Sequence, residues 1–232
     1  MTEKARAIHG QAEIARESGD FLKALQLTDE GTIAYQKEGD LLGLAEIQSS
    51  RFITLKHLFQ KTGEKSYLVL AKHAAESSVE IAQHSGQPEA LAIPYLNLGE
   101  AYAQLEQWSE AVEAYSKAVA YFTKSPPPFN NRPAVLSNIK SHLYQAEYKT
   151  GDKSALARAE QVIKELEKQD EDSYNKNVWL SGAHMRIAEK VKDDNLLKAQ
   201  EHLQIAKEII DSDKRLELRK GQWKKLNSQF TS

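Results

Sequence analysis

The distribution of proline constrains the fold of this 232-residue chain more than any other feature. All six prolines lie between Pro88 and Pro133, so residues 1–87 and 134–232 contain none. Because proline breaks the interior of a helix, these two proline-free stretches permit long helices. Glycine punctuates the chain instead. Each such glycine is followed by a polar residue, as is typical of a helix C-cap and turn, and the positions are Gly19, Gly39, Gly63, Gly86 and Gly151.

Between these glycines, apolar residues recur at steps of three and four. Clear examples are the run from Leu41 to Phe59 and the run from Val135 to Ala146. This spacing places apolar side chains on one face of a helix. No stretch sustains the alternation with period two that a half-buried strand shows. We therefore predict an all-α fold.

Composition narrows the possible classes of protein. Hydrophobic residues make up 41% of the chain, which is enough for a sizeable core. The net charge of −2 argues against a globally basic protein that binds nucleic acid or anionic membranes. The absence of cysteine excludes a disulfide scaffold, thiolate catalysis and cysteine-ligated metal sites. There is neither a secretory signal nor a run of 18 apolar residues, so we expect a cytoplasmic protein with no membrane partner.

The predicted turns recur with a period of about 44 residues. They lie 44, 43, 45 and 42 residues apart, at Gly19, Gly63, Glu106, Gly151 and Asp193. A helix with alanines follows each turn, and small residues let two helices approach closely. We therefore expect five helix hairpins in one domain of residues 1–212. Its units span about residues 1–39, 40–86, 87–125, 132–172 and 173–212, and a basic capping helix follows at 213–232. A non-repeat helical bundle is the alternative architecture.

The third unit resembles the tetratricopeptide repeat (TPR). The resemblance is carried by Tyr95, Leu98, Gly99, Tyr102, Trp108, Ala111, Tyr115 and Ala118. The other units are more degenerate, and the family period is about 34 residues. The resemblance implies a right-handed α-α superhelix, a TPR-like solenoid whose first helices line a concave groove.

This resemblance locates the expected binding site on the groove-facing residues of the first helices. Transferring the register of the third unit to the others gives His9, Glu13, Ile53, His57, Lys61, Asn97, Glu100, Gln104, Asn138, His142, Gln145 and Lys149. We expect these side chains to be exposed and to bind an extended peptide or a helix. Asn97 also matches the asparagine with which some family members clamp a C-terminal carboxylate, although the surrounding lysine pattern is incomplete.

The sequence offers no catalytic motif. None of the seven histidines forms an H-E-x-x-H zinc motif, and no phosphate-binding glycine loop or G-x-S-x-G elbow is present. We therefore expect no catalytic residue, no metal and no cofactor.

The sequence favours a protein-interaction module, an adaptor or scaffold that holds a protein or peptide partner. One alternative is a sensory or regulatory protein that controls a partner by contact. Others are a homo-oligomeric scaffold such as a homodimer, and an enzyme or small-molecule carrier. Two further segments have open roles. Pro126–Pro128 is either a stiff loop or a docking segment anchored by Phe129. The basic C-terminal helix is either a cap or a patch for an acidic partner, RNA or lipid.

Overall fold

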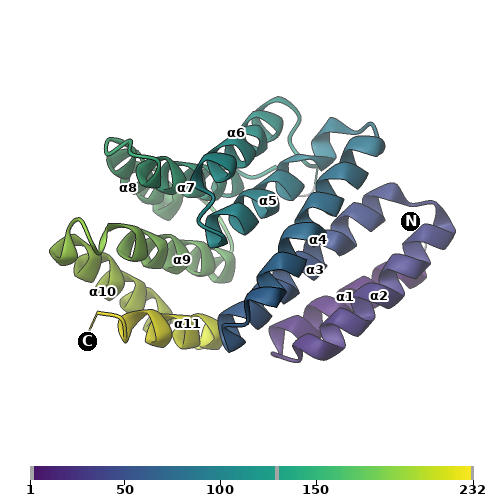
Figure 1. The fold of residues 1–232 in the computed structure, drawn as a ribbon, viewed down its shortest axis with the longest axis horizontal. Coiled ribbons are helices and arrows are strands. Elements are labelled where there is room, and N and C mark those ends of the chain that lie inside the picture. The colour runs from purple at the N-terminus through teal and green to yellow at the C-terminus, as the bar shows by residue number, and fades with distance from the viewer. Residues whose placement is uncertain (1–2, 129–130, 231–232) are drawn as a thin grey trace. The chain divides into compact units, whose positions relative to one another are not determined.

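The computed structural model describes residues 3–128 and 131–230, and all regular elements within these ranges are helical (Figure 1). The all-α prediction is confirmed. The chain divides into two compact units, residues 1–130 and residues 131–232. Among the described residues, no helix is both long and apolar enough to cross a membrane.

The first unit consists of three helix hairpins. Neighbouring helices pack against each other as the pairs α1–α2, α3–α4 and α5–α6. Their bounds are α1 (Glu3–Glu17), α2 (Phe21–Glu38), α3 (Leu41–Thr62), α4 (Lys65–His84), α5 (Ala92–Gln104) and α6 (Trp108–Lys124), and a short 3-10 helix, η1 (Pro88–Ala90), precedes α5.

The second unit consists of two hairpins and a final helix. The pairs are α7–α8 and α9–α10, and α11 packs on both α9 and α10. The bounds are α7 (Pro133–Lys149), α8 (Ala155–Lys168), α9 (Ser173–Val191), α10 (Leu196–Ser212) and α11 (Glu217–Asn227). The assignment of all five hairpins to one domain of residues 1–212 stays a prediction.

The turns are where the glycines predict them. The five punctuating glycines all have positive φ, between 67° and 109°. This left-handed conformation is open to glycine without steric penalty. At the remaining turn of the first unit, Glu106 adopts a φ of 59° without being glycine. Aspartates cap the helices that follow two of these turns: Asp20 accepts a hydrogen bond from the Lys23 amide, and Asp40 from the Gly43 amide.

Two tyrosines pack directly on helix backbone at glycines. The ring of Tyr115 in α6 covers Gly99 in α5, where an added Cβ would lie 2.5 Å from ring carbons. Tyr35 in α2 covers Gly43 in α3 in the same way. Both rings are almost completely buried. At these two positions the helices therefore approach too closely for any side chain.

The last helix is held by its apolar side. The indole nitrogen of Trp223 donates a hydrogen bond to the Leu203 carbonyl at 2.9 Å. Leu226 and Phe230 pack against the same core. Trp223 is therefore a packing residue and not an outward-facing contact.

The proline-rich segment is not helical. Pro126–Pro128 lie outside any helix, and Phe129 lies outside the described residues.

Gly99→Ala tests the tyrosine packing. We expect it to lower the free energy of unfolding by about 1–3 kcal/mol, because the Tyr115 ring must shift to admit the methyl group. Urea denaturation measures this change. Gly10→Ala in α1 is the control: its Cβ would meet nothing within 4 Å, so helix propensity alone predicts a gain of up to about 1 kcal/mol. Equal stability of the two variants would contradict the packing argument.

Candidate functional site

The first helices of successive hairpins touch one another in both units. In the first unit, α1 contacts α3, and α3 contacts α5. Ion pairs cross both contacts: Arg6 to Glu46 at 3.8 Å, and Lys56 Nζ to Glu100 Oε2 at 2.5 Å. We call the side of α1, α3 and α5 that carries these pairs the first-helix surface. In the second unit, α7 contacts α9, and Arg186 Nε donates to Gln145 Oε1 at 3.1 Å.

The structure separates the predicted site residues into three groups. Glu13, Lys61, Gln104 and Lys149 are exposed, and Ile53, His57 and Glu100 are half-buried. The expectation of exposure is wrong for the third group, which is buried: His9, Asn97, Asn138, His142 and Gln145. The physical reason is the direct packing of first helices, which covers positions that a wider groove would leave open. The role of all twelve residues in binding stays a prediction.

His9 shows how this packing uses a predicted groove residue. Its Nε2 lies 2.7 Å from Ser50 Oγ in α3, and its Nδ1 lies 3.5 Å from the Tyr35 hydroxyl. Burial holds the pKa of His9 below its ordinary value, and the charges of Arg16 and Arg6 lower it further, against the opposing effect of Glu13. His9 is therefore a neutral side chain that ties α1 to α3.

Asn97 is a buried polar residue of the first-helix surface with an unsatisfied side-chain amide. It is 5% exposed, and its amide Nδ2 has no hydrogen-bond partner among the described residues. The Lys56–Glu100 pair lies one turn further along α5, because Glu100 follows Asn97 by three residues. A buried donor without a partner lowers stability by about 1–3 kcal/mol. A carbonyl group supplied by a partner would remove that penalty.

His57 and Lys61 share one aromatic neighbour. The ring centroid of His57 lies 5.8 Å from that of Phe21, and Lys61 Nζ lies 5.5 Å from the Phe21 centroid. Two predicted residues near the end of α3 thus contact the same residue in the first turn of α2. The Lys61 cation and the His57 imidazole both lie against the buried ring of Phe21.

Sequence reasoning missed Lys56. A signal was present, because Lys56 and Glu100 have opposite charges and lie 44 residues apart, which is one repeat period. Residues one period apart occupy equivalent places in neighbouring hairpins. Opposite charges at that spacing therefore predict an ion pair between the hairpins.

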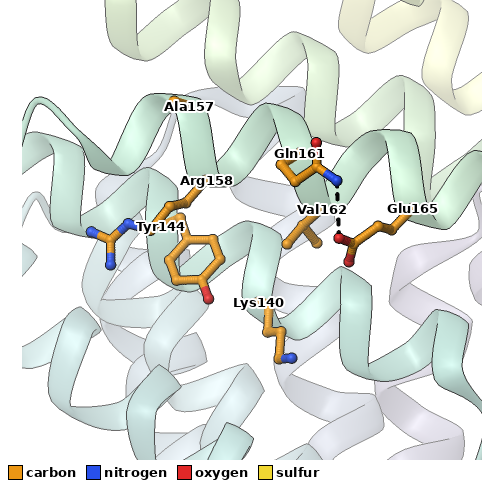
Figure 2. A pocket seen from close by; sticks show the side chains of 7 residues that line it. All are labelled: Lys140, Tyr144, Ala157, Arg158, Gln161, Val162 and Glu165. Carbon is orange, nitrogen blue, oxygen red and sulfur yellow. Dashed lines mark hydrogen bonds between the residues drawn. The ribbon is translucent and has the colours of Figure 1, made fainter.

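A shallow pocket of about 400 Å³ lies between α7 and α8. Figure 2 shows the side chains that line it, with Lys140 and Tyr144 on α7 and the others on α8. The Arg158 guanidinium lies 4.9 Å from the Tyr144 ring centroid and forms ion pairs with Glu147 and Asp152. Gln161 donates to Glu165 at 3.1 Å. The pocket brings no nucleophile together with a general base.

A chain of three titratable groups, two buried histidines and the half-buried Glu160, links three helices of the second unit. Glu160 in α8 lies 3.2 Å from His202 Nε2 in α10, and His202 Nδ1 lies 2.8 Å from His184 Nδ1 in α9. Because a carboxylate only accepts, His202 Nε2–H donates to Glu160, and the unprotonated Nδ1 of His202 accepts a hydrogen bond from His184 Nδ1–H. Lys198 Nζ, 2.6 Å from Glu160, favours the carboxylate form. Among the described residues, no group of three His, Asp or Glu side chains has the geometry of a metal site.

Comparison with known proteins identifies the repeat. Residues 92–125 match the family model of the tetratricopeptide repeat. These residues form a TPR. The match covers α5, α6 and the turn between them, so the resemblance predicted from the third unit is confirmed.

Solved structures show the same fold over most of the chain. Nearly identical TPR-like repeats assigned to a kinesin light chain of Podosopora anserina share 19% identity with it. They align over 91% of this chain and 97% of theirs, with a TM-score of 0.58. A variant of that protein with one residue substituted gives 18% identity, coverage of 91% and 98%, and a TM-score of 0.60. BtubC (BKLC) from P. vanneervenii shares 22% identity with this chain. The alignment covers 88% of this chain and 79% of that one, with a TM-score of 0.57. The comparison with curated proteins gives no match. The TPR-like fold is therefore shown beyond the single matched repeat.

The Glu160–His202–His184 chain predicts acid sensitivity. Burial, aided by His202, lowers the pKa of His184 from 6.5 to about 4, and burial also lowers the pKa of His202. The unfolded chain therefore binds more protons than the folded chain as pH falls from 6.5 to 4. Stability is retained above pH 6.5 and declines below it, by up to about 3 kcal/mol for His184 at pH 4. Urea denaturation at a series of pH values measures this decline.

The control for this prediction is a pair of glutamine variants. His184→Gln removes the buried imidazole, whereas His84→Gln changes an exposed histidine at the end of α4. Below pH 6.5, the loss of stability should be smaller in His184→Gln than in wild type and unchanged in His84→Gln. Parallel pH profiles for all three proteins would show that His184 does not titrate as described.

Proposed function

We propose that the chain is a non-enzymatic protein-interaction module that binds a peptide or a helix along the first-helix surface. Stacked helical hairpins present extended surfaces that suit such partners. The TPR at residues 92–125 and the TPR-like solved structures support this class of function. A cytoplasmic location and the identity of the partner stay predictions.

The amide of Asn97 is the observation that carries this proposal. Its Nδ2 is a buried donor without a partner among the described residues, whereas His9 is paired with Ser50 and Lys56 with Glu100 on the same first helices. An extended peptide offers main-chain carbonyl groups at regular intervals. The half-buried Ile53, Ile93 and Leu96 supply apolar area on the same first helices.

A peptide that reaches Asn97 would have to displace part of the neighbouring Lys56–Glu100 ion pair. Both side chains are less than 20% exposed, so the pair is partly desolvated. Separating these charges without replacing their partners would be unfavourable. The peptide side chains beside the bound carbonyl are therefore expected to be polar or charged, so that they replace one of the two partners.

Asn97→Leu tests the proposal by separating stability from binding. The leucine removes the unpaired donor at nearly constant volume, so the free energy of unfolding should be unchanged or higher by about 1 kcal/mol. Affinity should fall about tenfold, as expected for the loss of one buried hydrogen bond. Peptides selected from a random library on the full chain serve as the probes, and isothermal calorimetry measures their affinity.

Glu80→Ala is the matched control, because Glu80 is an exposed residue of α4, a second helix. Selected peptides should bind this variant as they bind wild type. Peptides that bind wild type and Asn97→Leu equally would place the binding site elsewhere. Failure to select any peptide would favour the regulatory protein or the homo-oligomeric scaffold. Light scattering across a concentration series would test the homo-oligomer directly.

A further inference from the structure

The outward side of α11 concentrates positive charge. We call it the α11 basic face, and it consists of exposed residues of the helix and of the segment just before it: Lys214, Leu218, Lys220, Gly221, Lys224 and Lys225. Residues 131–232 contain 19 Lys and Arg against 16 Asp and Glu, whereas residues 1–130 contain 12 against 17. The basic excess of the second unit is thus hidden in the overall net charge of −2.

Few carboxylates oppose this charge. Lys220 lies 4.0 Å from Glu217, whose side chain is 77% exposed. Among the described residues, Lys214 and Lys224 have no carboxylate within ion-pair distance. Arg215 provides the contrast, since it binds Asp213 through two nitrogens at 2.7 and 2.9 Å. Arg215 is neutralised within the fold, whereas Lys214 and Lys224 are not.

Two features of this face weaken the helix that carries it. Lys220 and Lys224 are four residues apart, where like charges repel across one turn. Gly221 lies in the helix interior, where glycine is less stable than alanine, and a Cβ at this position would meet nothing within 4 Å. Packing therefore explains neither the spacing of the two lysines nor the glycine between them. Residues that break local rules without a compensating contact are expected at functional sites.

The opposite side of α11 fixes the face in place. Trp223 and Leu226 pack on the core of the second unit, and the Trp223 indole is bound to the Leu203 carbonyl. The backbone of α11 is therefore held from its apolar side. A partner would meet preorganised lysines at a low cost in main-chain entropy.

We propose that the α11 basic face is a docking site for an acidic segment of a partner protein. Carboxylates of that segment would pair with Lys214, Lys220 and Lys224, and an apolar side chain would cover Leu218. The missing side chain at Gly221 lets the partner backbone approach the helix. This site lies on a different helix from the first-helix surface and does not depend on the function proposed for it.

The structure favours an acidic protein segment over the other anionic partners. Single-stranded nucleic acid is bound by basic grooves with aromatic platforms, but the one aromatic residue of α11, Trp223, faces the core. An amphipathic helix on a membrane inserts an apolar face, but the apolar side of α11 is already occupied. The positive charge of the lysines suits a short segment rich in Glu and Asp. The exposed Leu218 suits one apolar side chain within that segment.

Neutralising two lysines tests the proposal. The probe is a fluorescein-labelled synthetic peptide in which glutamates alternate with leucine and alanine, and anisotropy measures its binding to the full chain. In Lys220→Gln/Lys224→Gln, affinity should fall about tenfold, as expected for the loss of two surface ion pairs. Lys164→Gln/Lys168→Gln is the matched control, because both lysines are exposed and have the same spacing on α8. It should bind as wild type does.

A glycine variant provides an independent readout. Gly221→Gln should raise the melting temperature, because glutamine is a better helix former, and yet weaken binding of the peptide by filling the close approach. Equal affinity of wild type, Gly221→Gln and the Lys220/Lys224 variant would overturn the proposal. Binding of poly-uridine RNA or of phosphatidylserine vesicles, but not of the peptide, would also overturn it. Circular dichroism confirms that each variant is folded.

Discussion

The spacing of neighbouring helices depends on contacts that leave no room for another carbon atom, both within a hairpin and between successive hairpins. Tyr115 lies on the bare backbone at Gly99, and Tyr35 lies in the same way at Gly43. Alanines without any exposed surface, such as Ala71, continue these contacts along other helices. Interiors this tightly packed tolerate little change in volume. The contact of Tyr35 with Gly43 joins the first two hairpins, whose first helices, α1 and α3, also touch.

This close approach explains why polar residues of the first helices are buried. Side chains between touching helices lose their hydration and must find partners in the fold. His9 finds Ser50, and Gln145 finds Arg186. Against this background, the unpaired amide of Asn97 is informative, since the same packing that satisfies its neighbours leaves it unsatisfied. In the proposed binding surface, the group that the fold leaves unpaired therefore carries more information than the groups that the fold exposes.

The sequence predicts local structure here better than it predicts the candidate site. Each punctuating glycine adopts the left-handed conformation expected of it, because that requirement arises within a single turn. Glu106 shows that a turn in this series does not require glycine. Exposure of Asn97 or His142 is a different kind of property, because it depends on how far a neighbouring helix has rotated. One residue step turns a helix by about 100°, which moves a side chain from an open face to an interface. Repeat period and apolar spacing do not determine that rotation.

Charge illustrates the same limit on a larger scale. The net charge of −2 argues against a basic binding protein, but it averages an acidic unit with a basic one. At physiological ionic strength the screening length is about 8 Å, and the 11 residues of α11 extend over about 16 Å. A partner on α11 is therefore influenced mainly by the charges within that range, such as Lys214, Lys220 and Lys224, rather than by the net charge of the whole chain. Net charge excludes partners only when charge is spread evenly, and α11 alone carries four Lys or Arg residues against one Glu.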